Sequence, residues 1–482
     1  MKPILIVGAG PCGLTAAVYL THYGIPVRII DKKIGPTKTS NAVGVQARTL
    51  ELLEEVGLAS LFKDAGRICT EGAIFHQKKS IAHIELGNHI KSLYNYICML
   101  PQCSTESILI EFLTKKKITV EYNTELTQLV NKKDYVDTTI IKGDDSASES
   151  YQFLISADGY NSFVRTQLAI PYSGADYSYK FIMIDSPILP CKQLEKQMVI
   201  AAGDKVNMLI FPMQASCRFI AEISQSTEYN VKHDYHTFND LAKELLPFDI
   251  SIQPETWSST FYVHERLAKS YRKNTIFLLG DAVHSHIPAG AQGMNTGMQD
   301  AINLSWKIAR VIKNSSAIGI LDSYELERRQ VAQHVLRLTN RMGKTLLSKN
   351  ILVRTFVTAI ASILSRLNNV QKLFSNTLAQ LDIHYTSSSL SMGKKSGNIS
   401  PGHRLSNIPV VAAYEKYILL DGIGDIPLVW GQSYSIIVIT HIEHYPWAKN
   451  KYCLIRPDRY IAYLGGRKSD VLTYFKCSTS SQ

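Results

Sequence analysis

Apolar and polar positions at the start of the chain alternate in blocks that predict a strand, a helix and a second strand. Ile4–Val7 is a continuous apolar run, as in parallel strands that are covered on both faces. Leu14–Tyr23 has a helical pattern, and Val27–Ile30 is predicted to be a second strand that ends at Asp31. Helices are also expected at about 48–56 and 105–116. This order is typical of a parallel α/β sheet.

The pattern changes in the middle of the chain and again towards its end. Residues 169–262 contain short β-like runs with one helical stretch, His236–Leu246, and Ile276–Leu279 then returns to a buried parallel strand. A segment rich in Ser, Gly and Lys at 386–401 is typical of a linker. We therefore predict an α/β fold made of four parts: a discontinuous Rossmann-type domain (1–168 and 263–345), an inserted β-sheet domain (169–262), a helical segment (346–385) and a small C-terminal domain (396–482).

Composition narrows the class of protein. Hydrophobic residues make up 45% and charged residues 19% of the 482 residues, which is ordinary for a folded soluble protein. The eight cysteines include no C-x-x-C pair or zinc spacing, so we expect a cytoplasmic protein without a metal site. The net charge of +11 has no basic stripe with interleaved aromatics, which argues against a nucleic-acid partner. The apolar stretch Ile351–Leu367 is interrupted by polar residues and is too short to span a membrane.

The first chemical motif is Gly8-Ala9-Gly10-Pro11-Cys12-Gly13, between the first strand and the first helix. Gly8 permits a tight turn, Gly10 lets the backbone approach a pyrophosphate, and Gly13 lets helix and sheet pack closely. The positive end of the helix then faces the phosphates. Asp31, followed by Lys32, stands where an acid binds the ribose of an unphosphorylated adenosine. The motif predicts FAD or NAD(H).

Later motifs decide between these two cofactors. Asp158-Gly159 and Gly280-Asp281 each follow a predicted strand, and a glycine-rich turn then runs from Ile287 into a helix that begins near Gly293. A carboxylate at a strand end can accept hydrogen bonds from sugar-like hydroxyls, and a helix start presents free N–H groups to an anion. FAD has a ribityl chain and, when reduced, a ring anion, whereas NAD has neither. We therefore predict that the cofactor is FAD.

Together, these motifs and several others resemble the class A flavoprotein monooxygenases, specifically the phenol hydroxylase-like branch of the aromatic hydroxylases. The resemblance covers almost the whole chain and rests on motifs in the family's order: Gly8–Gly13, Arg48–Glu51, Leu100–Gln102, Ala157–Gly159, Gly280-Asp281, Gly293–Asn295 and Leu321–Arg328. The C-terminal part, with Pro401-Gly402 and Ile455–Asp458, resembles that branch's thioredoxin-like domain. It has no cysteine pair, so packing or homodimer contact is expected there rather than redox chemistry.

The resemblance implies a chemistry and a role for each motif. NADPH or NADH would reduce FAD, O2 would form a flavin hydroperoxide, and its distal oxygen would hydroxylate a small aromatic substrate, phenolic or polyketide-like. The implied FAD contacts are Arg48 and Gln102 near the pyrophosphate and ribityl chain, Asp281 at the ribityl hydroxyls, and Gly290 together with Gly293, Met294 and Asn295 at the isoalloxazine edge. Pro288 would border the oxygen-activation pocket, and Asp158 and Gly159 would lie where FAD and the nicotinamide donor are handled.

The sequence departs from the resemblance at one informative position. Several phenol hydroxylases have an acid just before the glycine that corresponds to Gly44, but here that position is Val43. The substrate-activating base is therefore not identified, and polycyclic substrates or insertion of oxygen into a ring remain open. We expect His284 and His286 to be hydrogen-bonded scaffold. The alternatives are a flavin oxidase or reductase without oxygen insertion, and a non-catalytic flavoprotein that binds and shields a metabolite.

Overall fold

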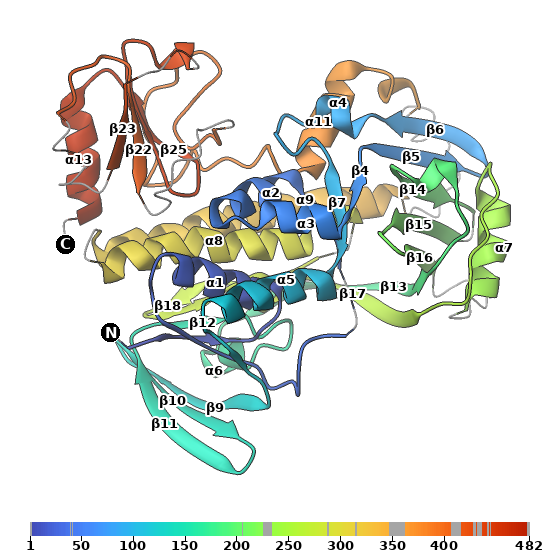
Figure 1. Ribbon diagram of the computed structural model, residues 1–482, viewed down its shortest axis with the longest axis horizontal. Helices are drawn as coiled ribbons and strands as arrows, with labels where there is room; N and C mark the ends of the chain where they lie inside the picture. Colours follow the sequence, from blue (N-terminus) through green and yellow to red (C-terminus); the bar gives the residue numbers. More distant parts are fainter. Residues whose placement is uncertain are drawn as a thin grey trace.

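A central sheet of six strands carries the first domain of the computed structural model (Figure 1). Strand β1 pairs in parallel with β2 and β12, and β12 pairs in parallel with β19, so their carboxyl ends share one edge. In sheet order the strands are β18 (Arg272–Lys273), β19 (Ile276–Leu278), β12 (Leu154–Ser156), β1 (Ile4–Val7), β2 (Val27–Ile30) and β8 (Val120–Glu121). The structure describes residues 2–38, 40, 42–204, 206–224, 234–286, 289–313, 316–346, 362–405, 416–427, 430, 436–440, 443 and 445–479.

Helices pack against this sheet and bury its apolar strands. The apolar residues of β1, β12 and β19 form one core with those of helices α1 (Pro11–His22) and α8 (Gly293–Ile312). Other helices of the described chain are α2 (Ala47–Leu53), α3 (Ala59–Ala65), α4 (Leu86–His89), α5 (Gln102–Lys115), α6 (Phe163–Gln167), α9 (Asp322–Leu346) and α11 (Asn368–Leu378). The helices expected at about 48–56 and 105–116 are confirmed, and the first of them ends at Gly57 in the left-handed region, with φ 71°.

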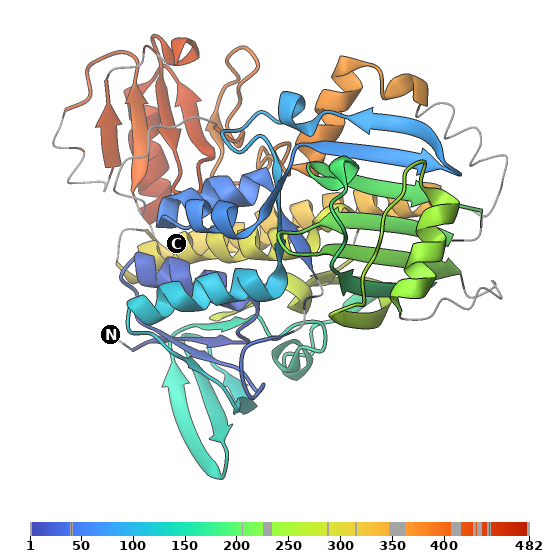
Figure 2. The same ribbon diagram turned by 45° about the vertical axis from the view of Figure 1, so that its right-hand side comes forward.

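A second, eight-stranded sheet lies beside the first domain (Figure 2). Helix α7 (Tyr235–Leu245) covers one of its faces through Phe238, Leu241 and Leu245. Its strands, in sheet order, are β20 (His284–Ser285), β17 (Trp257–Ala268), β13 (Tyr172–Ser186), β16 (Cys217–Ser224), β15 (Val206–Pro212), β14 (Gln197–Ala202), β5 (Glu71–His76) and β6 (Lys79–Ile84).

The boundary predicted for this sheet, 169–262, was too narrow. Strands β5 and β6 belong to the sheet because β5 pairs in parallel with β14, from Glu71 opposite Gln197 to His76 opposite Ala202. Strand β17 also continues to Ala268. Two smaller three-stranded sheets lie within residues 43–151, in the orders β11-β10-β9 (Asp145–Tyr151, Val136–Lys142, Thr124–Asn131) and β3-β7-β4 (Val43–Val45, Ile97–Pro101, Arg67–Cys69).

The C-terminal sheet domain, residues 392–479, contains five described strands and packs against α8 (Figure 1). In sheet order these are β21 (Met392–Gly393), β25 (Ile461–Gly465), β24 (Tyr452–Ile455), β22 (Tyr417–Asp421) and β23 (Ile436–Ile439), and α13 (Lys468–Thr479) follows them. The segment predicted as a linker therefore supplies an edge strand, β21. Most of the apolar stretch at 351–367 lies outside the described residues; within them, no helix has the length and apolar character needed to cross a membrane.

Candidate functional site

One cavity of about 750 Å³ lies where the first domain meets the eight-stranded sheet. It opens at the carboxyl ends of the parallel strands, where ligands bind in open α/β sheets. The turns after β1, β12 and β19 all contribute to its wall, and so does the start of α8. The sequence-predicted residues that line it are Gly8, Gly10, Asp31, Lys32, Gln102, Asp158, Gly159, Asp281, Gly293 and Met294.

The glycines of the first turn differ in what surrounds them. Gly8 has φ 104°, and a Cβ on it would lie 2.3 Å from the carbonyl oxygen of Ala157. A Cβ on Gly13 would lie 1.9 Å from the carbonyl oxygen of Gly8, so Gly13 allows the helix to pack on the turn. A Cβ on Gly10 would meet nothing within 4 Å. The backbone at Gly10 therefore borders open space that a ligand can fill.

Asp31 is held in place by the backbone around it. Its carboxylate accepts hydrogen bonds from the N–H of Ala9, at 2.8 Å, and of Lys33, at 2.9 Å. The first bond joins the end of β2 to the glycine turn, so the acid and the turn form one cradle. Asp31 and Lys32 both line the cavity.

Asp281 lies on the short turn Gly280–Ala282 after β19 and lines the cavity. Among the described residues this carboxylate has no hydrogen-bond partner, whereas its backbone carbonyl accepts a bond from Tyr172 Oη at 2.9 Å. Although the cavity leaves it open to solvent, the surrounding protein desolvates it and raises the pKa of its carboxyl. A ligand that donates hydrogen bonds would satisfy this group.

Only some of the residues predicted to contact the cofactor at the start of α8 line the cavity. Gly293 and Met294 line it, but Asn295 is buried behind them. The Asn295 amide donates to the carbonyls of Gly44 and Ala291, at 3.0 and 2.8 Å, and accepts from the N–H of Gln46 at 2.9 Å. The structure therefore does not bring the Asn295 side chain to the cavity wall; this side chain instead fixes the 44–46 segment against the helix.

Gly290 and Pro288 were predicted next to the reacting centre. Gly290 does not line the cavity; it has φ 75°, and a Cβ on it would lie 2.9 Å from a methyl carbon of Leu378. Its carbonyl accepts a hydrogen bond from Gln46 Nε2 at 2.9 Å. Its neighbour Ala291 does line the cavity, so Gly290 shapes the wall from behind. Pro288 lies outside the described residues.

The structure also places Arg48, a predicted FAD contact, away from the cavity. The Arg48 side chain is fully buried and does not line the cavity. Its guanidinium donates to Glu51 at 3.0 Å and to the backbone carbonyl of Asp458 at 2.7 Å, and it lies 4.9 Å from the ring centre of Tyr460. Arg48 therefore joins the first domain to the C-terminal sheet domain. The motif located the residue correctly on α2, but it did not indicate which side of the helix faced the cofactor.

Asp158, Gly159 and Gln102 do line the cavity. The Asp158 carboxylate accepts from Ser156 Oγ and from the N–H of Val164 at 3.1 Å, so it caps the start of α6 and fixes the turn. Gly159 has φ 80°, a conformation that favours glycine, and a Cβ there would meet nothing within 4 Å. Gln102 donates to Glu106 at 2.8 Å. These hydrogen bonds fix the position of the cavity wall at Asp158 and Gln102.

The sequence did not identify the far wall of the cavity. Phe211, Ile220 and Phe261 line it from β15, β16 and β17, and Val43 lies in the wall of the first domain. These residues follow the ordinary alternation of a half-buried strand, so nothing in the sequence separated them from other core positions. The expectation for His284 is supported, because the ring is buried and its Nε2 lies 2.8 Å from Asp300 Oδ2 in a hydrogen bond.

These features fit FAD. The open space at Gly10, the fixed acid at Asp31 and the unpartnered carboxylate at Asp281 suit a dinucleotide that also carries a hydroxylated chain. The described start of α8 has no side-chain cap, so its first N–H groups are available to an acceptor. The apolar far wall suits an aromatic ring.

Comparisons with known proteins agree with this geometry. The model of the family described as "FAD binding domain" matches residues 1–339. The chain is 28% identical to 6-methylpretetramide 4-monooxygenase of Streptomyces rimosus over 83% of this chain and 73% of that protein. It is 28% identical to rifampicin monooxygenase of Rhodococcus hoagii over 98% and 97%, and 30% identical to pentachlorophenol 4-monooxygenase of Sphingobium chlorophenolicum over 71% and 65%.

Solved structures have the same fold. The anhydrotetracycline hydroxylase OxyS of Streptomyces rimosus superposes with a TM-score of 0.80 at 22% identity, covering 100% of this chain and 99% of that one. The flavin-dependent monooxygenase PieE, solved with FAD and substrate, gives a TM-score of 0.80 at 18% identity, with coverage of 98% and 97%. The chain therefore belongs to the FAD binding domain family and is an FAD-dependent monooxygenase of the class A aromatic hydroxylase type.

Proposed function

We propose that FAD lies along the cavity, with its adenosine end at Gly8, Gly10 and Asp31 and its ribityl chain at Asp281. Its isoalloxazine ring would then reach the start of α8 at Gly293 and Met294. This order is supported by the cavity, which runs without interruption between these residues. When bound, FAD would supply the activation of O2. The protein's own groups bind and orient the cofactor, and the helix start favours negative charge on the ring.

The substrate class that we propose is a phenolic or polycyclic aromatic compound. The observation that carries this proposal is the continuity of the cavity from the cradle to Phe211, Ile220 and Phe261. Apolar and aromatic walls bind flat rings, and a few polar groups then fix their orientation. The named activities of the relatives, on a pretetramide, rifampicin and pentachlorophenol, are consistent with this class. Because Val43 stands where an acid would activate a phenol, we propose that another group performs that task.

We propose NADH or NADPH as the reductant and O2 as the co-substrate. The proposal is supported by aromatic and cationic groups beside the turn that follows β12. Tyr160 stacks on His264 with ring centres 5.2 Å apart, and the Arg165 guanidinium lies 3.9 Å from the ring centre of Tyr172. Tyr160 and His264 line the cavity. Rings of this kind can stack on a base, and the Arg165 cation packs on Tyr172, whose ring meets that of Tyr160 edge-on.

We also propose that the chain belongs to the phenol hydroxylase-like branch, with an inserted substrate sheet and a thioredoxin-like C-terminal domain. The strand order β25-β24-β22-β23 supports the second point, because β22 and β23 are parallel while β24 runs antiparallel to β22 and β25. The helix α13 after β25 completes a pattern that is typical of that fold. The eight-stranded sheet would carry the substrate wall, with β5 and β6 added from the first domain.

The function is tested by aerobic oxidation of NADH and NADPH with a panel of phenols and polyketide aromatics, followed by mass spectrometry under ¹⁸O₂. We expect one donor to be oxidised faster with a correct substrate and one ¹⁸O atom to enter the product. Substrate turnover without ¹⁸O would favour a flavin oxidase or reductase. Ligand binding without any stimulated oxidation would favour the non-catalytic flavoprotein.

A further inference from the structure

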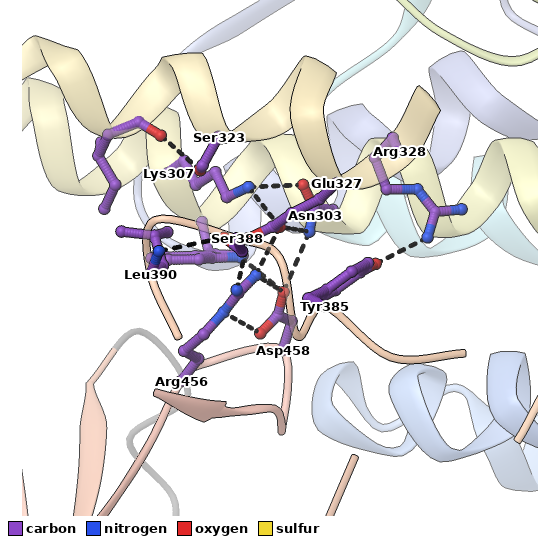
Figure 3. A network of polar contacts seen from close by, with 12 residues as sticks. Asn303, Lys307, Ser323, Glu327, Arg328, Tyr385, Ser388, Leu390, Arg456 and Asp458 are labelled. Carbon is purple, nitrogen blue, oxygen red and sulfur yellow. Dashed lines mark hydrogen bonds and ion pairs between the residues drawn. The ribbon is translucent and has the colours of Figure 1, made fainter. Parts of the chain in front are cut away.

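A buried network of charges joins the C-terminal sheet domain to helices α8 and α9 (Figure 3). Glu327 accepts hydrogen bonds from Lys307 at 2.8 Å and from both terminal nitrogens of Arg456, at 2.6 and 2.8 Å. Asp458 binds the same arginine and also accepts from Asn303 at 3.2 Å. The side chains of Lys307, Glu327 and Arg456 have no exposed surface. The charged side chains at this contact between the two domains are therefore shielded from bulk solvent.

The neighbouring residue on α9, Arg328, extends this network towards the cofactor site. Its Nε donates to Asp300 at 2.6 Å, its Nη1 donates to Tyr385 Oη at 2.8 Å, and its Nη2 donates to the backbone carbonyl of Thr296 at 3.0 Å. The Tyr385 ring lies 4.2 Å, centre to centre, from the ring of Tyr460 in the C-terminal sheet domain. Arg328 thus links a contact of that domain to α8.

Asp300 connects Arg328 to the turn that contains Asp281. One of its carboxylate oxygens binds Arg328, and the other accepts from the N–H of Gly280 at 3.2 Å and contacts His284 at 2.8 Å. Burial opposes the charge on Asp300, but Arg328 and His284 outweigh it and hold the pKa of the carboxyl below its usual range. The residues on both sides of Asp281 are therefore anchored to one buried carboxylate.

We propose that Tyr385, Arg328 and Asp300 are positioning residues through which the C-terminal sheet domain sets the geometry of the Asp281 turn and so the affinity for FAD. The inference rests on the proposed role of Asp281 at the ribityl chain. The C-terminal sheet domain would then influence the cofactor site although none of its described residues lines the cavity. The physical basis is that a buried guanidinium with every partner fixed cannot shift at one end without moving its other partners.

The test is Tyr385→Phe in the full-length protein, which removes one hydroxyl and keeps the ring against Tyr460. One N–H of Arg328 then loses its acceptor, and we expect FAD binding to weaken by about fivefold to tenfold. The dissociation constant is measured by titrating FAD into the deflavinated protein. The visible spectrum of the holoenzyme provides a second readout, because it reports the surroundings of the flavin ring.

The matched control is Tyr417→Phe, which removes a buried hydroxyl within the C-terminal sheet domain. That hydroxyl pairs with Tyr474 Oη at 3.2 Å and, among the residues that the structure describes, forms no hydrogen bond with Asp300 or Arg328. We expect a similar loss in melting temperature from both variants, but a change in FAD affinity and flavin spectrum only from Tyr385→Phe. If Tyr385→Phe leaves both unchanged, or if Tyr417→Phe weakens FAD equally, the proposal is overturned.

Two further variants test the Tyr460–Tyr385 contact and the role of Asp281 separately. Tyr460→Leu removes the ring of the C-terminal sheet domain that packs on Tyr385, and it should weaken FAD binding in the same direction. Unchanged affinity there would disprove the role of the C-terminal sheet domain. If Asp281→Asn weakens FAD binding while Tyr385→Phe does not, the relay fails and the proposed site stands. If Asp281→Asn has no effect either, the proposed role of Asp281 itself fails.

Discussion

A methyl group on Gly13 would lie 1.9 Å from the carbonyl oxygen of Gly8, so helix α1 and the turn after β1 are in direct backbone contact. We expect Gly13→Ala to push the two apart and to lower the free energy of unfolding by about 1–3 kcal/mol. FAD affinity should fall with it. Thermal unfolding of the deflavinated variant and an FAD titration measure the two effects.

Gly10→Ala is the matched substitution in the same motif, with the opposite expectation. Its methyl group would enter open space rather than a backbone atom. The deflavinated protein should therefore unfold at the wild-type temperature, while FAD binds less well because the methyl group occupies the cradle. Equal losses of stability from Gly10→Ala and Gly13→Ala would contradict this division of roles.

Asp281→Asn should separate stability from cofactor binding. Because the folded protein raises the pKa of this carboxyl above 3.8, its charge costs stability at every pH above the folded value. We expect the deflavinated variant to melt at a higher temperature than wild type near pH 7, and the gain to shrink as the pH falls towards 3.8.

FAD binding should move in the other direction for the same variant, because an amide replaces a charged acceptor. The expected weakening is roughly tenfold or more. Asp249→Asn, at an exposed position, is the control and should change neither quantity. A lower melting temperature for deflavinated Asp281→Asn near pH 7 would disprove the assigned cost of the desolvated charge.

Arg456→Met should destabilise the protein strongly. Glu327 would keep Lys307 but lose two charge-assisted hydrogen bonds inside a contact that is shielded from bulk solvent. Removal of one partner from a buried ion pair costs about 3–5 kcal/mol. Urea unfolding measures the loss, and Lys115→Ala, at an exposed pair with Glu111, is the control that should cause no measurable change.

Phe261→Ala tests the proposed substrate wall. The ring lines the cavity and stacks on Phe181 with ring centres 5.3 Å apart. We expect KM for an aromatic substrate to rise roughly tenfold because apolar contact with the substrate is lost, and we expect FAD affinity to stay unchanged. Phe248→Ala, on the face of the sheet that α7 covers, is the matched control. An unchanged KM would show that the substrate does not bind against Phe261.

The sequence predicted the parts of the fold that local patterns determine. Ile4–Val7 is uniformly apolar because neighbouring strands and helices cover it, and Val27–Ile30 is apolar apart from Arg28; the glycine spacing requires a turn at Gly8. A few neighbouring residues are enough to predict features of this kind. The same is true of Asp281, whose place at a strand end indicated a position at the edge of the sheet.

Side-chain direction and long-range pairing were not predictable in this way. Arg48 and Asn295 belong to the right motifs, yet both point away from the cavity, and a motif does not state which face of a helix meets a ligand. Their partners, Asp458 and Gly44, lie far away in the sequence. The pairing of β5 with β14 likewise depends on the fold as a whole.

That pairing has a consequence for engineering. Since β5 and β6 complete the edge of the eight-stranded sheet, a chimera that exchanges only residues 172–268 would join the five strands β13 to β17 of one parent to β5, β6 and β20 of the other. The mismatched edge would expose unpaired backbone groups and invite aggregation. A chimera designed to transfer a new substrate specificity should therefore take residues 71–84 and the later strands of this sheet from the same parent.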